Sequence, residues 1–92
     1  KAAVEMLSVY MARELGGRGI TVNTIAPGAI ATDFGGGLVR DDAGVNAQFA
    51  AMTALGRVGL PDDIGDAIAA LLSDKLGWMN AQRIEVSGGM FL

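Results

Sequence analysis

The sequence has no cysteine and no histidine among its 92 residues. Without cysteine there can be no disulfide and no thiolate metal site, and the redox state of the compartment stays open. Without histidine, the commonest imidazole metal ligand and general base is missing as well. We therefore expect no metal centre in this chain.

Basic residues are few, and no apolar run is long. The net charge is -3 and the isoelectric point is near 4.6, so no basic stripe is available to neutralise nucleic-acid phosphates or an anionic membrane. The longest unbroken apolar run covers residues 67–72, whereas a membrane-spanning helix needs about 20 residues. Residues 1–15 contain Glu5, Arg13 and Glu14 and do not form a signal-peptide core. We expect a cytoplasmic protein with neither nucleic-acid nor membrane partners.

Charged residues make up only 18% of the chain, against about 25% in an average domain, and hydrophobic residues make up 51%. A chain of this size buries about 60% of the surface that its unfolded form exposes. The apolar surface therefore exceeds what two short strands and three helices can cover. We expect the chain to self-associate.

One segment of β-branched residues meets a Pro-Gly pair. The Thr, Val and Ile side chains of residues 21–26 favour an extended, largely apolar strand, as in a buried parallel sheet. Pro27 removes a ladder donor, and Gly28 permits backbone angles that other residues resist. In open α/β sheets, ligands bind at the carboxyl ends of strands, which is where this loop would lie. Two interpretations stay open: the loop backbone and the Thr32 hydroxyl bind a polar ligand, or the loop is a turn in which Thr32 caps a helix.

Two segments show helical periodicity. In residues 2–15 the apolar stripe is wide enough to predict burial on two sides, and Gly16-Gly17 ends the helix. In residues 61–73 the apolar residues follow the pattern i, i+3, i+4, i+7, i+8, namely Ile64, Ala67, Ile68, Leu71 and Leu72. Pro61 suits the first turn of this second helix.

Charges surround the start of the second helix. Asp62 and Asp63 place negative charge at the positive end of the helix dipole. Arg57 lies just upstream, and an ion pair with Asp62 or Asp63 is the simplest role for it. We interpret Arg57 as structural.

The last segment, residues 82–87, alternates polar and apolar side chains, which predicts a strand, and Gly88-Gly89 then turns the chain. Residues 34–55 lie between the strand and helix patterns and begin with a flexible glycine triplet, Gly35-Gly36-Gly37. Arg40 in this region could meet an anionic substrate, but a solvated cluster with Asp41 and Asp42 is the simpler interpretation.

Four segments in this order and spacing resemble the C-terminal part of a short-chain dehydrogenase/reductase: Lys1-Ala2-Ala3-Val4-Glu5, residues 21–32, residues 56–64 and residues 84–90. The resemblance covers nearly the whole chain. It implies an α/β fold, the C-terminal part of a Rossmann-type doubly wound parallel sheet, in the order helix, strand, lid loop, helix, strand. Residues 1–92 would form a single partial domain, with residues 34–55 as the lid over the substrate.

The resemblance also implies a function, namely hydride transfer between NAD or NADP and a small carbonyl or alcohol substrate, in a homo-oligomer. Lys1 would match the lysine of the Tyr-x-x-x-Lys motif, which holds the nicotinamide ribose and lowers the pKa of the catalytic tyrosine. Ile30 would offer backbone hydrogen bonds to the nicotinamide carboxamide, and Thr32 a hydroxyl close to it. Pro27 and Gly28 would shape the nicotinamide pocket. Asn23, in the strand, would be structural.

The family's catalytic tyrosine and serine and its glycine-rich phosphate loop have no counterpart in these residues. The sequence therefore reads as a fragment, and we expect the 92-residue species alone not to turn over substrate. The alternative interpretation is a non-catalytic module that self-associates through its exposed strand edge and its first helix. The substrate, and the choice of NAD or NADP, are not evident from the sequence.

Overall fold

The computed structural model describes residues 2–92 of the chain. Its α-helices and β-strands, in chain order, are α1 (Ala2–Leu15), β1 (Thr24–Pro27), α2 (Leu38–Asp41), α3 (Ala43–Ala51), α4 (Pro61–Leu71) and β2 (Arg83–Val86). Short 3-10 turns occupy Gly16–Arg18, Phe34–Gly37 and Asp74–Leu76. The long helices and both strands were predicted, within a few residues at their ends.

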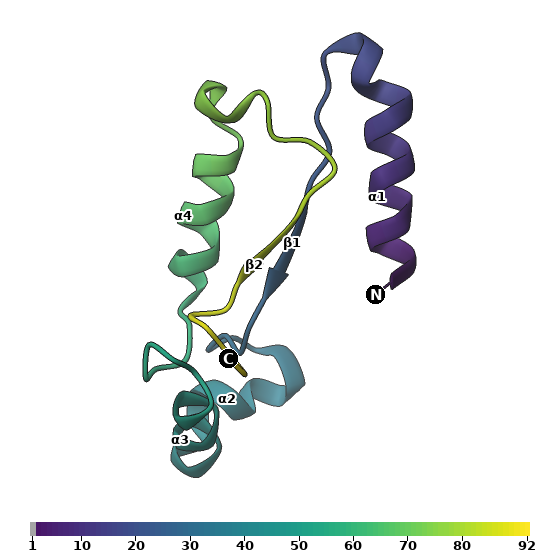
Figure 1. Ribbon diagram of the computed structural model, residues 1–92. Coiled ribbons are helices and arrows are strands. Elements are labelled where there is room, and N and C mark those ends of the chain that lie inside the picture. The colour runs from purple at the N-terminus through teal and green to yellow at the C-terminus, as the bar shows by residue number, and fades with distance from the viewer. Residues whose placement is uncertain (1) are drawn as a thin grey trace.

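The two strands form a parallel pair, with Thr24 opposite Arg83 at one end and Pro27 opposite Val86 at the other. In Figure 1, α4 lies on one side of this pair and α1 on the other, while α2 and α3 lie beyond the end of β1. The α/β class and the parallel sheet are therefore confirmed. Since β1 and β2 are the only strands in residues 2–92, each strand has an edge with no neighbour.

β1 begins three residues later than the sequence predicted, because before Thr24 two side chains pair with the backbone beside one backbone bond, from the N–H of Ala81 to the carbonyl of Val22 at 2.9 Å. Asn23 Oδ1 accepts a hydrogen bond from the N–H of Gln82 at 3.0 Å, and its Nδ2 donates to the carbonyl of Met79 at 3.2 Å. Asn80 Oδ1 in turn accepts from the N–H of Val22 at 2.9 Å. Such local bonds compete with a regular ladder. The structural role expected for Asn23 is thus confirmed.

Helix α1 has the predicted length, but its predicted burial on two sides is wrong for this chain. Ala12 is its one fully buried residue, while Val4 and Leu7 are each 58% exposed and Tyr10 is 66% exposed. An ion pair of 2.8 Å between Arg83 Nε of β2 and Glu5 Oε1 connects the helix to the sheet. The reason is that nothing in residues 2–92 covers the outer face of the helix.

The lid region is largely helical, which corrects the predicted irregular loop. Asp42 caps α3 because its Oδ1 accepts a hydrogen bond from the N–H of Val45 at 3.0 Å. Asn46 Nδ2 donates to the carbonyl of Val39 at 2.9 Å and so connects α3 with α2. These polar contacts stabilise the ends of α2 and α3, although the apolar periodicity of the segment is weak.

The C-terminal residues run antiparallel to the segment that follows α3. The N–H groups of Ala54 and Leu55 donate to the carbonyls of Gly89 and Gly88, each at 3.0 Å, and the N–H of Phe91 donates to the carbonyl of Met52 at 3.0 Å. The turn predicted at Gly88-Gly89 is present. This pairing fixes the end of the lid region to the end of the chain.

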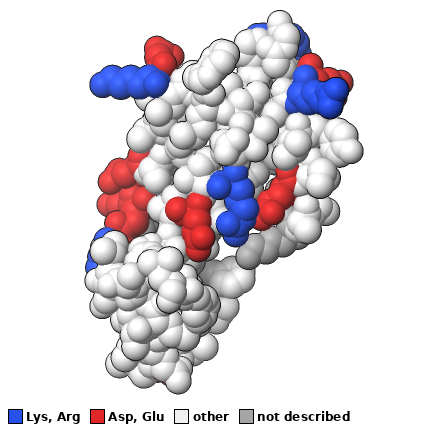
Figure 2. Space-filling model, viewed as in Figure 1, with Lys and Arg blue, Asp and Glu red and all other residues white. Residues whose placement is uncertain are grey.

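The core of this chain is small. Only Ala12, Ala26 and Val58 are buried apolar residues in the described part of the chain, and the molecule measures 49 × 27 × 25 Å. On the face in Figure 2, charged side chains are scattered over the strands and the long helices, whereas the surface around α2 and α3 is almost uncharged. The predicted excess of apolar surface is confirmed by exposed large hydrophobic side chains such as Leu55, Leu72 and Trp78.

Candidate functional site

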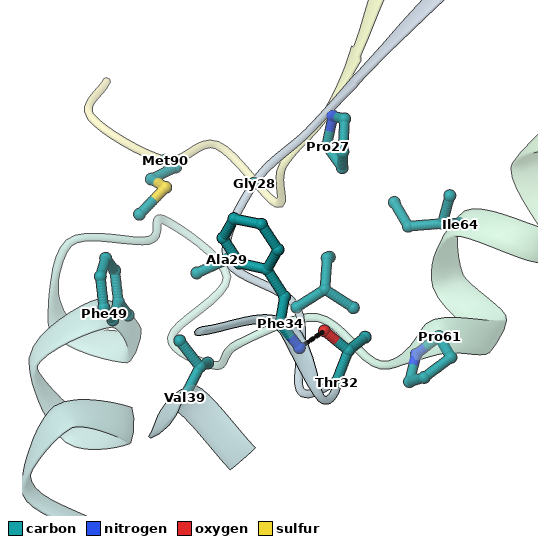
Figure 3. Close-up of a pocket in the computed structure, with 11 residues that line it drawn as sticks. Pro27, Gly28, Ala29, Thr32, Phe34, Val39, Phe49, Pro61, Ile64 and Met90 are labelled. Atoms are coloured by element: carbon teal, nitrogen blue, oxygen red, sulfur yellow. Dashed lines mark hydrogen bonds between the residues drawn. The ribbon is translucent and has the colours of Figure 1, made fainter. Parts of the chain in front are cut away.

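A pocket of about 630 Å³ lies at the carboxyl end of β1, where the sequence placed the ligand crevice. Strand and loop residues form its floor, α4 one wall, and the lid helices and the chain end the other, as Figure 3 shows. The lining residues are Pro27, Gly28, Ala29, Ile30, Thr32, Phe34, Val39, Phe49, Pro61, Ile64 and Met90. Every lining side chain except that of Thr32 is apolar.

Four of the five predicted cofactor-binding residues lie together in this pocket: Pro27, Gly28, Ile30 and Thr32. The fifth, Lys1, is outside the described residues. The sequence reasoning did not single out Phe34, Val39 or Met90 as lining residues. The only sequence signal for them was their apolar character within or beside the lid and the C-terminal turn.

Gly28 is required by space rather than by unusual backbone angles, which corrects the prediction. It is not among the glycines with positive φ. A Cβ placed on Gly28 would lie 2.9 Å from Ser87 Cβ and 3.0 Å from Ser87 Cα. The N–H of Gly28 donates to the carbonyl of Val86 at 3.2 Å, so the two chain segments are in close contact where the pocket begins.

Ile30 keeps its own backbone polar groups free. It forms a parallel bridge with Gly59, in which the N–H of Ala31 donates to the carbonyl of Gly59 and the N–H of Gly59 donates to the carbonyl of Ala29, both at 2.9 Å. Neither the N–H nor the carbonyl of Ile30 has a hydrogen-bond partner among residues 2–92. One donor and one acceptor are therefore available beside the pocket floor.

Thr32 takes part in the local turn and still has a hydrogen to donate. Its Oγ1 accepts a hydrogen bond from the N–H of Phe34 at 3.2 Å, drawn as a dashed line in Figure 3. This is a local turn interaction and not the helix cap left open by the sequence, because the N-cap of the following 3-10 turn is Asp33, which makes no side-chain capping bond. In the described residues the Thr32 hydroxyl donates to no acceptor, so its hydrogen remains available.

Arg57 forms the ion pair that the sequence predicted, and its partner is Asp63. The distances are 2.7 Å from Nη1 to Oδ2 and 3.0 Å from Nη2 to Oδ1. The Asp63 carboxylate also accepts a hydrogen bond from the N–H of Leu60 at 2.7 Å and so caps α4. The Arg57 guanidinium and this backbone bond lower the pKa of Asp63 to about 2.

Arg40 belongs to an exposed ionic cluster, as predicted, although one of its partners differs. It pairs with Asp41 and with Asp33, whereas Asp42 caps α3 instead. Hydrogen bonds from Arg40 lower the pKa of Asp41. Arg40 does not line the pocket, so the simpler interpretation of its charge holds for this chain.

A family model described as enoyl-(acyl carrier protein) reductase matches residues 1–91 of the chain. The chain belongs to the short-chain dehydrogenase/reductase family. The resemblance expected from the four sequence segments is thereby confirmed. Oxidoreductases of this family use NAD or NADP.

Two curated relatives match over the whole chain. The 3-oxoacyl-[acyl-carrier-protein] reductase FabG of Escherichia coli K12 is 41% identical over 93 residues, and the (3R)-3-hydroxyacyl-CoA dehydrogenase of the mouse is 39% identical over 92 residues. The match covers 36% and 34% of these proteins. The chain thus spans about a third of the length of these short-chain dehydrogenase/reductase relatives.

Solved structures of the family agree with the fold. The promiscuous reductase LugOII superposes with a TM-score of 0.87 at 37% identity, covering 99% of this chain and 35% of that one. A 3-oxoacyl-[acyl-carrier protein] reductase from Brucella melitensis with bound NAD gives 0.82 at 31% identity, over 99% and 31%. The angucycline C-6 ketoreductase LanV with bound NADP gives 0.85 at 31% identity, over 98% and 34%. Both cofactors thus occur among similar structures.

Other kinds of site are not found in the described residues. Residues 2–92 hold no group of three or more histidine, cysteine, aspartate or glutamate side chains that could bind a metal ion. No helix within these residues is both long enough and apolar enough to cross a membrane.

Proposed function

We propose that this chain forms the nicotinamide and substrate side of the active site of an NAD(P)-dependent oxidoreductase that acts on a small carbonyl or alcohol. The observation that carries the proposal is the pocket at the end of β1, because it combines an apolar interior with a few convergent polar groups. Ile30, whose backbone N–H and carbonyl have no partner within residues 2–92, and Thr32, whose hydroxyl has a hydrogen to donate, both line this otherwise apolar cavity.

Each polar group of the pocket suits part of the nicotinamide. A carboxamide has one acceptor oxygen and one donor nitrogen, which complement the N–H and the carbonyl of Ile30. The Thr32 hydroxyl supplies a second donor close by. Pro27 and Gly28 would give the ring a flat apolar contact where Gly28 lies close to Ser87. A nicotinamide bound in this way would have its reacting carbon oriented toward the substrate.

The proton chemistry depends on the start of the chain. By family resemblance, Lys1 would hold the nicotinamide ribose, and its charge would lower the pKa of a catalytic tyrosine that acts as general acid or base. When bound, the cofactor supplies the hydride, while the protein positions the reactants and moves the proton. The names of the FabG and mouse relatives favour 3-oxoacyl or 3-hydroxyacyl compounds as the first substrates to test.

Turnover measured on two materials tests this proposal. The natural protein that contains these residues should reduce a ketone panel with NADH or NADPH, whereas the 92-residue chain alone should give no turnover. The reason is that positioning and proton transfer need groups beyond those in this sequence. Absence of turnover in the natural protein with either cofactor, across acyl and simple ketones, would contradict the assignment.

A second function is favoured by the exposed apolar surface. The open edges of β1 and β2 and the uncovered face of α1 suit a module that associates with its own copies. An antiparallel join of two edges would give a four-stranded sheet with two-fold symmetry. Light scattering on the 92-residue chain should then give a mass near twice 9.4 kDa. A compact monomer at high concentration would count against association.

A further inference from the structure

Gly59 lies next to the pocket floor without lining the pocket itself. It forms a parallel bridge with Ile30 and so connects the segment that leads into α4 with the loop after β1. Ile30 lines both the main pocket and a smaller cavity of about 160 Å³, whereas Gly59 lines the smaller cavity and not the main pocket. Ile30 is thus part of the boundary between the two cavities, and Gly59 supports it from one side.

The end of the Ile30 side chain occupies the space that a side chain at position 59 would need. A Cβ on Gly59 would overlap with Ile30 Cδ1, whereas the next nearest atoms, the Ala29 carbonyl oxygen and Ile30 Cγ1, would lie at 3.5 and 3.8 Å. Gly59 is not among the residues with positive φ. The glycine is therefore required by one methyl group of Ile30 and not by its backbone angles.

The backbone of Gly59 also sets the direction of the Ile30 backbone. Gly59 donates to the carbonyl of Ala29 and accepts from the N–H of Ala31, both at 2.9 Å. In an extended segment the polar groups of successive residues point to opposite edges, so the N–H and the carbonyl of Ile30 point away from Gly59. This bridge is the reason that both groups are free of partners within residues 2–92.

The residues on both sides of Gly59 are held in place. Arg57 Nη1 donates to the carbonyl of Val58 at 3.0 Å and to Asp63 Oδ2 at 2.7 Å. The N–H of Leu60 donates to the same carboxylate oxygen at 2.7 Å. Val58 is only 8% exposed. The segment around Gly59 therefore has little freedom to move away from a new contact.

A side chain at position 59 would consequently displace Ile30. The displaced Ile30 side chain would move away from position 59 and toward the main pocket, which it also lines. We propose that Gly59 is a positioning residue of the nicotinamide site, because it leaves room for the Ile30 side chain outside the pocket and orients the Ile30 backbone for the carboxamide. The inference rests on the function proposed above.

Calorimetry on the natural protein that contains these residues tests this role. Two ligands are compared, namely the preferred reduced dinucleotide and its fragment without nicotinamide, ADP-ribose or ADP-ribose 2′-phosphate. In Gly59→Ala the Kd of the dinucleotide should rise about three- to tenfold, as for the loss of one or two hydrogen bonds, and the Kd of the fragment less than about twofold. A glycine with a merely structural role would weaken both ligands alike.

Ile30→Val provides the rescue, because valine lacks the Cδ1 atom that a Cβ at position 59 would meet. In the Ile30→Val background, Gly59→Ala should raise the Kd of the dinucleotide less than about twofold, so the two substitutions are coupled. The matched control is Gly17→Ala, because a Cβ on Gly17 meets no atom within 4 Å and Gly17 lines neither cavity. It should leave both dissociation constants unchanged.

Three results would overturn the role of Gly59. One is equal weakening of the dinucleotide and the fragment in Gly59→Ala, or no weakening of either. Another is a loss that persists undiminished in the Ile30→Val background. The third is a large fall in the thermal unfolding midpoint of Gly59→Ala, because moving the end of one side chain into open space should cost little stability.

The two proposals can fail separately. If Gly59→Ala weakens only the dinucleotide and the wild type nevertheless turns over no ketone, the role of Gly59 stands and the oxidoreductase assignment fails. If turnover is normal and Gly59→Ala binds the dinucleotide as the wild type does, the assignment stands and the role of Gly59 is wrong. A wild-type protein that binds neither dinucleotide would overturn both.

Discussion

At the scale of single residues, Gly28 determines how closely the two strands approach at the pocket. Gly28→Ala would place a Cβ 2.9 Å from Ser87 Cβ, which forces the strands apart. We expect a loss of about 1–3 kcal/mol in the free energy of unfolding, measured by urea denaturation. Gly17→Ala is the control, because a Cβ there meets nothing within 4 Å, and it should change stability little. An equal effect of both substitutions would contradict the close approach.

We expect the Asp63 carboxylate to affect how the thermal stability of the chain depends on pH in acid. Its pKa in the folded chain is about 2, below the ordinary value of 3.8, because Arg57 and the N–H of Leu60 stabilise the charged form. The resulting stabilisation is fully present above about pH 4 and is lost as the pH falls through about 2. The thermal midpoint of Asp63→Asn should therefore depend less on pH in this window than that of the wild type.

Asp62→Asn provides the comparison for the acid titration. It removes a carboxylate from the same helical turn and leaves the pair between Arg57 and Asp63 in place. Its thermal midpoint should decline between pH 4 and 2 as the wild type does. If Asp63→Asn and Asp62→Asn behave alike, the ion pair does not set the acid stability of α4.

At the scale of elements, the cap of α3 is open to a direct test. Asp42 Oδ1 accepts the hydrogen bond from the N–H of Val45, so Asp42→Ala should cost about 1 kcal/mol of unfolding free energy. Asp42→Ser retains a capping oxygen and should cost much less. Chemical denaturation of the three proteins measures the difference. Equal losses for Ala and Ser would show that the cap does not hold α3.

Strong periodicity made some elements predictable, and its absence hid others. The long apolar patterns of residues 2–15 and 61–73 gave α1 and α4, and the alternation before Gly88 gave β2. Helices α2 and α3 were missed, because their ends depend on Asp42 and Asn46 and not on an apolar face. The Pro-Gly loop located the pocket. Its far wall comes from other segments of the chain, and no local pattern around Val39 or Met90 predicts that these residues line the pocket.

At the scale of the whole molecule, the exposed face of α1 predicts association. Val4, Leu7 and Tyr10 recur every three residues and are each more than half exposed. The double substitution Leu7→Glu and Tyr10→Glu should lower the average mass of the 92-residue chain in light scattering, because charge disfavours apolar contact. Trp78→Glu, an equally polar change away from α1, should not lower it. An unchanged mass for the α1 variant would place the association elsewhere.

Whether the end of β1 receives the nicotinamide is tested most directly by a crystal structure of the natural protein with NAD or NADP. We predict that the carboxamide lies within hydrogen-bonding distance of the Ile30 backbone and the Thr32 hydroxyl, with the ring against Pro27 and Gly28. A nicotinamide bound elsewhere, with the Ile30 N–H and carbonyl paired to other parts of the protein, would contradict this account of the site.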